Sequence, residues 1–295
     1  MKEAISVVGA GTMGSQMVQR LLDNGRDVTV FDVSSTARQA AADQGARPAV
    51  SAADAASGSE VCILSLPNPA DVVGALSGPG GVLSADPLPA VIVDTSTVDQ
   101  RTSQRAFELA AARRVAFVDA PVLGRPDGCG NWTLPVGGEE SAIARARPHL
   151  EVLASQIVHV GPVGSGVVVK LLNNLMFAAI NAITAECLAG AERLGVSPGI
   201  FVETVANSGA ASVSNLFLDI GPRIVAADFA PAFTLALLRK DVELATAMLG
   251  EVGADTPLST ALGRLNERAA EQGLSELDTS ALVQLYRDAP QTKEG

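Results

Sequence analysis

The chain has 295 residues, enough for two domains of ordinary size, and its formal charge of −11 makes it strongly acidic. That charge repels phosphate backbones, and no stripe of Lys and Arg mixed with aromatic residues offsets it, so nucleic acid is excluded as an expected partner. No apolar run approaches the ~18 residues that cross a bilayer, no export signal is visible and the three cysteines lie far apart, so we expect a cytoplasmic protein without membrane, disulfide or metal site.

A glycine-rich turn follows the first apolar run. Residues 4–8 read as a strand, residues 9–14 have the sequence Gly-Ala-Gly-Thr-Met-Gly, and a helical pattern follows. In such a unit the first glycine permits a tight turn, the second lets a pyrophosphate approach the backbone, and the third lets the helix pack closely on the strand. The cofactor-binding residues expected here are Gly9, Gly11, Thr12, Met13 and Gly14.

An acidic residue ends the second predicted strand. Residues 28–31 are β-branched and aromatic, and Asp32 follows them. A carboxylate at this place accepts hydrogen bonds from a ribose and repels the 2′-phosphate of NADP, so the sequence favours NAD, with NADP less likely. Arg38 lies nearby in the sequence and weakens that preference.

Further strands are predicted with helical patterns between them, which indicates a parallel sheet covered by helices. The predicted ranges are 61–66, 90–94, 115–119, 132–136 and 157–160. Ligands collect at the carboxyl ends of such strands, so we expect the loops at Leu66 and Pro67, at Thr97 and at residues 120–125 to border cofactor and substrate. For Ser96 in the second of these loops, a turn or helix cap is the better interpretation.

The second half of the chain is predicted to be helical throughout. A helix over about residues 166–194 would be about 40 Å long and is expected to run between two domains, residues 1–163 and 164–295. Shorter helices are predicted over residues 199–207, 213–225, 233–249, 258–272 and 279–287.

Two polar residues near the start of the long helix suggest chemistry. Lys170 and Asn174 are four residues apart and therefore share one face. A lysine amine and a carboxamide at such a place can donate a proton to, and position, a carbonyl or hydroxyl oxygen. The alternative is a pair of solvated side chains on a helix surface. Lys240 lies on a second apolar helix, and a charged surface turn is the alternative there.

Taken together, the motifs resemble the β-hydroxyacid dehydrogenase family over nearly the whole chain. The segments that carry the resemblance are residues 9–14, the loop at Leu66 and Pro67, Asp-Thr-Ser-Thr at 94–97, Asp-Ala-Pro-Val at 119–122, residues 164–174 and residues 240–245. The resemblance implies an N-terminal Rossmann-type α/β domain with a parallel sheet, joined by a long interdomain helix to an all-α C-terminal domain. It also implies a homodimer or homotetramer.

The resemblance further implies residue roles. Lys170 would be the catalytic acid and base, Asn174 would position the same oxygen, and Lys240 would lie near the nicotinamide. Leu66, Pro67 and Thr97 fall on cofactor contacts of the family. The substrate segment departs from the family pattern Asp-Ala-Pro-Val-Ser-Gly-Gly: Leu123 stands in place of the serine and Arg125 in place of the second glycine, while Gly124 matches the first.

This departure removes the serine hydroxyl that commonly holds the substrate carboxylate. Arg125 either replaces that contact with a bidentate grip on a carboxylate or sulfonate, or points to solvent. The expected function is an NAD-dependent oxidoreductase that interconverts a small anionic 3-hydroxy acid, or a related compound such as a sulfonate, and its semialdehyde. The alternatives are an imine reductase of the same fold and a catalytically silent NAD(H)-binding protein.

Overall fold

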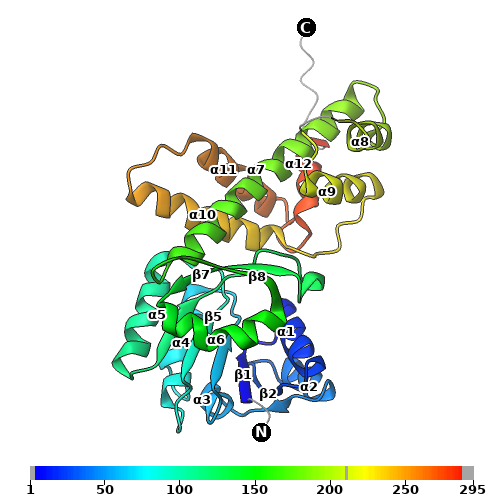
Figure 1. Ribbon diagram of the computed structural model, residues 1–295. Helices are drawn as coiled ribbons and strands as arrows, with labels where there is room; N and C mark the ends of the chain where they lie inside the picture. Colours follow the sequence, from blue (N-terminus) through cyan, green and yellow to red (C-terminus); the bar gives the residue numbers. More distant parts are fainter. Residues whose placement is uncertain (1–3, 210–211, 288–295) are drawn as a thin grey trace. The chain divides into compact units, whose positions relative to one another are not determined.

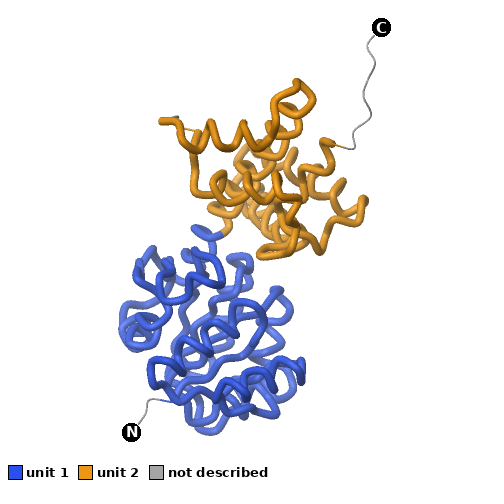
Figure 2. Tube along the Cα trace, turned by 90° about the vertical axis from the view of Figure 1, so that its right-hand side faces the viewer, with its two compact units in different colours: residues 1–170 blue, residues 171–295 orange. Residues whose placement is uncertain are grey.

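The computed structural model describes residues 4–209 and 212–287. The ends of the two expected domains, residues 1–3 and 288–295, lie outside the described residues. The chain separates into two compact units, Met1–Lys170 and Leu171–Gly295, and each is described by itself (Figure 2). The domain boundary expected at residue 163 stays a prediction.

Unit 1 is built on one eight-stranded sheet with the strand order β3-β2-β1-β4-β5-β6-β7-β8 (Figure 1). The strands are β1 (Ala4–Val8), β2 (Asp27–Phe31), β3 (Arg47–Pro48), β4 (Val61–Leu64), β5 (Val91–Asp94), β6 (Ala116–Asp119), β7 (Trp132–Gly138) and β8 (Ala154–Gly161). Every residue of β4 and β5 is buried, including Asp94 at the end of β5, and their apolar runs suit a sheet covered on both faces.

Helices cover the two faces of this sheet and form two hydrophobic cores. Met17, Leu21 and Leu150 belong to the core under α1, α2 and α6. Leu76 and Ala106 belong to the core under α3, α4 and α5. The helices are α1 (Thr12–Asp23), α2 (Ser35–Asp43), α3 (Ala52–Ala56), α4 (Pro69–Ser77), α5 (Gln100–Ala112) and α6 (Glu140–Leu153), with the short 3-10 helices η1 (Val82–Ser84) and η2 (Pro126–Gly128).

The predicted α/β class is confirmed, and two details of the sheet differ from the prediction. β7 runs antiparallel to β6, with Val118 paired to Gly138, so the sheet is not parallel throughout. The connection between β6 and β7 holds only the short η2 and no crossover helix, which suits an antiparallel pair. The two-residue strand β3 was missed, because a short edge strand with a proline has no alternating pattern.

Unit 2 is helical, as predicted, and is organised around α7 (Ser165–Arg193). Ala185 and Leu188 of α7 lie in one hydrophobic core with Leu238 and Val283. The other helices are α8 (Pro198–Ala206), α9 (Asn215–Ala226), α10 (Leu235–Glu251), α11 (Pro257–Glu271), η3 (Thr279–Leu282) and α12 (Val283–Arg287). Side chains of Ser214 and Thr234 cap α9 and α10 by accepting backbone N–H groups.

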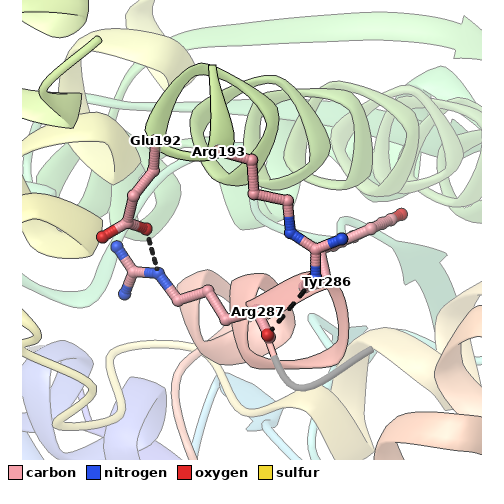
Figure 3. A network of polar contacts seen from close by, with 4 residues as sticks. All are labelled: Glu192, Arg193, Tyr286 and Arg287. Atoms are coloured by element: carbon pink, nitrogen blue, oxygen red, sulfur yellow. Dashed lines mark hydrogen bonds and ion pairs between the residues drawn. The ribbon is translucent and has the colours of Figure 1, made fainter. Parts of the chain in front are cut away.

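The last turn of α7 is fastened to α12 by charged side chains (Figure 3). Arg193 donates from Nη2 to the carbonyl oxygens of Tyr286 at 2.5 Å and Arg287 at 3.3 Å. Nε of Arg287 lies 2.9 Å from Oε2 of Glu192. These contacts satisfy carbonyl groups at the end of α12 that have no partner within the helix.

Helix α7 also meets the length and composition of a membrane span, with a mean hydropathy of 1.6 in its most apolar 18 residues. The expectation that no segment comes close to a span was therefore too strong, because Asn and Lys interrupt the apolar run without removing its high mean. Asn181 in this helix is buried and donates to the carbonyl of Thr279 at 2.8 Å. In unit 2, one side of α7 is therefore packed in the core, and 39% of its most apolar 18 residues is buried.

Candidate active site

The glycine turn has the close packing that its sequence predicts. Gly9 has φ +97°, and a Cβ on it would lie 2.2 Å from the carbonyl oxygen of Ser65. A Cβ on Gly14 would lie 2.0 Å from the carbonyl oxygen of Gly9. By contrast, a Cβ on Gly11 would meet nothing within 4 Å. The fold itself thus requires Gly9 and Gly14, whereas Gly11 leaves open space beside the backbone.

The open space lies at the N-terminus of α1. Gly11 is the N-cap residue, no side chain caps the helix, and its first turn has no acidic residue. Thr12 is exposed and Met13 packs partly against the sheet core. A helix N-terminus with free N–H groups and open backbone fits the pyrophosphate of a dinucleotide.

Asp32 joins the glycine turn to the loop after β2. Its Oδ2 accepts the N–H of Ala10 at 2.7 Å, and its Oδ1 accepts the N–H of Ser34 at 2.8 Å. Arg38 donates to the backbone carbonyl of Asp32, and its guanidinium lies 5.8 Å from the centre of the Phe31 ring. A carboxylate and a guanidinium therefore lie side by side where a ribose would bind, with opposite effects on a 2′-phosphate.

The loops after β4 and β5 are bonded to one another through Ser96. Its Oγ accepts the N–H of Leu66 at 2.9 Å, and its own N–H donates to Oδ1 of Asp94 at 2.9 Å. Ser96 thus joins the two loops, a role that its interpretation as a simple turn or cap did not include. Pro67 is exposed and Thr97 is half-buried in the same loops.

Asp94 ends β5 and is fully buried. Burial raises the pKa of this carboxyl to about 7, against the lowering effect of bonds from Ser96. The charge of Asp119, its register neighbour on β6, adds to the rise. Among the described residues, no group bonds to Oδ2 of Asp94. The sequence offered two signals for this residue, its place at the end of a buried strand and its position in the Asp-Thr-Ser-Thr motif at 94–97.

Asp119 ends β6 and accepts the N–H groups at the start of α7. Oδ1 lies 2.7 Å from the N of Gly164, and Oδ2 lies 2.9 Å from the N of Val167. Burial raises the pKa of Asp119, while these backbone bonds lower it. Helix α7, which carries the half-buried Lys170, therefore begins at the same sheet edge as the cofactor loops.

In unit 2, the side chain of Asn174 is part of a buried polar network. Its Nδ2 donates to Oδ2 of Asp241 at 2.6 Å, and its Oδ1 accepts from Asn173 at 3.2 Å. Nζ of Lys240 lies 3.2 Å from Oδ1 of Asp241. Asp241 thus connects two predicted site residues. Sequence reasoning missed it, although an acid next to Lys240 on an apolar helix was a visible signal.

The loop of residues 123–131 is called the recognition loop here, because its first residues are predicted to border the substrate. Trp132 holds this loop in shape. Leu123 and Thr133 exchange backbone hydrogen bonds of 2.9 and 3.2 Å, and indole Nε1 of Trp132 donates to the carbonyl of Arg125 at 2.6 Å. A Cβ on Gly124 would lie 2.3 Å from Cδ1 of Trp132. Leu123 and Arg125 are both half-buried. The indole therefore fixes the backbone that bears both side chains.

Within residues 4–209 and 212–287, no cluster of three or more His, Cys, Asp or Glu side chains is placed to hold a metal ion. The polar groups described suit a dinucleotide at the ends of β1, β2, β4 and β5.

Two family models cover the chain. Residues 4–161 match the NAD binding domain of 6-phosphogluconate dehydrogenase. Residues 164–286 match the model described as "NAD-binding of NADP-dependent 3-hydroxyisobutyrate dehydrogenase". Each match falls on one of the two halves that the sequence pattern distinguishes.

Individual proteins are similar over almost their full length. The chain is 34% identical over 292 residues to 3-hydroxyisobutyrate dehydrogenase of Pseudomonas aeruginosa, covering 96% of this chain and 98% of that protein. It is 32% identical over 288 residues to 3-sulfolactaldehyde reductase of Escherichia coli, covering 96% of each. The solved structure of Mycobacterium tuberculosis 3-hydroxyisobutyrate dehydrogenase with L-serine has a TM-score of 0.86 at 30% identity, covering 97% of this chain and 100% of that one. The chain therefore belongs to the β-hydroxyacid dehydrogenase family, and it is an NAD-dependent oxidoreductase that acts on CH–OH groups.

Proposed function

We propose that the enzyme interconverts a small anionic 3-hydroxy acid, or a related sulfonate, and its semialdehyde, with Lys170 as the general acid and base. The observation that carries the proposal is that α7 begins on Asp119, at the sheet edge where the loops of Leu66 and Ser96 also lie. In an open α/β sheet this edge is where ligands bind. The similar proteins named above act, by their names, on 3-hydroxyisobutyrate and 3-sulfolactaldehyde.

Bound NAD would supply or accept the hydride at the substrate carbon. In the reducing direction, the ammonium group of Lys170 gives its proton to the carbonyl oxygen as the C–H bond forms. In the oxidising direction, the neutral amine takes the hydroxyl proton as that C–H bond breaks. Asn174, one helical turn further, positions the same oxygen, and Asp241 fixes the orientation of its amide.

The proposed cofactor residues have separate tasks. Gly11 and the first turn of α1 approach the pyrophosphate, and Asp32 accepts the ribose hydroxyls. Gly9 and Gly14 shape the turn. The remaining contacts come from Thr12, Met13, Leu66, Pro67 and Thr97, and Lys240 adds positive potential near the nicotinamide. Asp32 selects NAD over NADP.

For substrate recognition, we propose that Arg125 binds the anionic group. Leu123 offers no hydroxyl where the family commonly has serine, and the fixed backbone of the recognition loop places the guanidinium-bearing residue two positions away. A guanidinium binds a carboxylate or a sulfonate through two parallel hydrogen bonds. Gly124 between them leaves the loop free of a side chain on the Trp132 side.

The test is a turnover screen with NAD and NADP against 3-hydroxyisobutyrate, glycerate, serine, 4-hydroxybutyrate and sulfolactate. Lys170→Ala should lower kcat by about 100- to 10,000-fold, because general acid catalysis contributes on that order. Arg125→Ala should raise KM by about tenfold or more, the loss of a charged hydrogen bond. Full turnover by Lys170→Ala refutes the assigned mechanism. Absence of any turnover by wild type that still binds NADH refutes the reaction and revives the silent binding protein.

We further propose that the enzyme is a homodimer or homotetramer in the cytoplasm. Leu172, Met176 and Ile183 lie four and seven residues apart on α7 and are 37%, 66% and 55% exposed. Such an apolar stripe suits a second copy of the chain. Met176→Asp together with Ile183→Asp should lower the mass measured by light scattering, and an unchanged mass speaks against this face.

All three cysteines are free, which suits a reducing compartment.

A further inference from the structure

Two buried carboxylates end neighbouring strands directly below the proposed site. Asp94 on β5 and Asp119 on β6 are register partners, and neither side chain is exposed. Asp94 accepts a hydrogen bond from the backbone N–H of Ser96, and the Ser96 hydroxyl accepts one from the N–H of Leu66. Asp119 holds the start of α7. One carboxylate thus organises the cofactor loops, and the other organises the helix that carries Lys170.

The contact of Asp119 with α7 uses both of its oxygens. Gly164 and Val167 donate backbone N–H groups that have no acceptor within the helix, at 2.7 and 2.9 Å. A carboxylate at this end of a helix is also stabilised by the helix dipole. These bonds offset part of the cost of burying the charge, although burial still raises the pKa of Asp119 on balance; both oxygens are bonded, so Asp119 is an anchor rather than an unsatisfied group.

The first turn of α7 has almost no freedom to shift around this anchor. A Cβ on Gly166 would lie 2.5 Å from the carbonyl oxygen of Pro135 and 2.7 Å from Oδ2 of Asp119. A Cβ on Gly164 would lie 2.7 Å from Cγ of Gln100. Val167 is fully buried in the core beneath α3, α4 and α5. The helix start is therefore in direct contact with β6, β7 and α5.

We propose that Asp119 is a positioning residue of the reaction, because it fixes the start of α7 and thereby the distance of Lys170 from the cofactor loops. Lys170 follows Val167 by three residues, a rise of about 4.5 Å along the helix. A displacement of about 1 Å in a reacting group lowers a rate by about 100-fold. The inference rests on the proposed role of Lys170 and adds the group that places it.

The principal test is Asp119→Asn. An amide of the same size accepts only one of the two N–H groups and turns an N–H group of its own toward the other. We expect kcat to fall about 10- to 100-fold, while the Kd for NADH, measured by fluorescence titration, stays within about twofold of wild type. Amide hydrogen exchange in peptides covering residues 160–172 should become faster, with peptides from β1 and α1 unchanged.

A second variant reaches the same helix start without changing a charge. Gly166→Ala places a methyl group against Pro135 and Asp119 and should produce the same fall in kcat with the same retained NADH affinity. Ser165→Ala, in the same turn, is its matched control and should behave as wild type, because the Ser165 hydroxyl has no hydrogen bond in the described structure. Asp54→Asn, at the N-terminus of α3, is the matched control for the carboxylate change.

The outcomes separate the two proposals. Wild-type kcat in both Asp119→Asn and Gly166→Ala overturns the positioning role, even if Lys170→Ala is inactive. Unchanged hydrogen exchange in Asp119→Asn overturns the anchor whatever the turnover. If Asp119→Asn loses NADH binding, Gly166→Ala decides, and a normal kcat there counts against the proposal. If wild type turns over no substrate, the proposed function fails while the exchange measurement still tests the anchor.

Discussion

Replacing Asp94 by asparagine should make the free energy of unfolding of unit 1 less dependent on pH. Burial raises the pKa of this carboxyl from 3.8 to about 7. The folded protein therefore holds a proton that the unfolded chain has released, and the stability that this proton represents is present below the unfolded pKa and lost as pH rises through the folded pKa. An asparagine has the same shape and no charge to bury.

The size of the effect follows from the shift. A difference of about three pKa units corresponds to about 4 kcal/mol in total, and about 2.5 kcal/mol of it falls between about pH 5 and pH 8. Between these pH values the free energy of unfolding of the wild type should fall by about 2.5 kcal/mol more than that of Asp94→Asn. The stability of the variant relative to the wild type therefore increases as pH rises. Part of the gain at high pH comes from removing repulsion with Asp119.

The free energy of unfolding is measured by urea titration at about pH 5 and at about pH 8, with tryptophan fluorescence as the signal. Trp132 is the only tryptophan in the sequence, is buried and lies in unit 1, so its emission reports the unfolding of that unit. Asp43→Asn, which changes an exposed carboxylate on α2, serves as the control and should parallel wild type. If the stability of Asp94→Asn falls with pH as steeply as that of wild type, the raised pKa and its cause are refuted.

Four further substitutions test the cofactor and substrate parts of the site. Gly11→Ala should leave the melting temperature unchanged but weaken NADH binding about tenfold or more, whereas Gly14→Ala should lower both, because its Cβ would lie 2.0 Å from a backbone oxygen; equal melting curves for the two would contradict this difference. Asp32→Ala should raise the ratio of kcat/KM with NADPH to kcat/KM with NADH by about tenfold, and an unchanged ratio removes Asp32 from cofactor selection. Gly124→Ala should cost about 1–3 kcal/mol in urea unfolding through its contact with Trp132 and raise the substrate KM, and a wild-type KM would show that the loop tolerates a shift.

The sequence predicted most elements because their signals are local. The turn at Gly9 to Gly14, the strand before it and the helix after it depend on residues close together in the chain, and the structure has each of them. The antiparallel pairing of β7 could not be predicted in this way, because it depends on the direction in which the chain runs back beside β6. Local periodicity holds no information about that choice.

The predicted site shows the same division. Lys170 and Asn174 were found from their spacing on one helix, and their catalytic roles stay a prediction. Asp119 was noticed only as part of a motif, because Gly164, its partner, lies far along the chain. Asp241 was passed over although it binds Asn174: its place beside Lys240 was visible in the sequence, but the contact between the two helices was not. The carboxylates that arrange the site were thus harder to find than the groups proposed to react.

The indole of Trp132 has a consequence for how this enzyme can change its substrate. The recognition loop is bonded to it through the carbonyl of Arg125 and packed on it at Gly124, so the path of the main chain is set independently of the side chains at positions 123 and 125. If the side chains at positions 123 and 125 contact the substrate, as proposed, new specificities can arise by exchanging them on an unchanged scaffold. A combinatorial library at positions 123 and 125, with Trp132 and Gly124 kept, is the economical starting point for redirecting the enzyme to other hydroxy compounds.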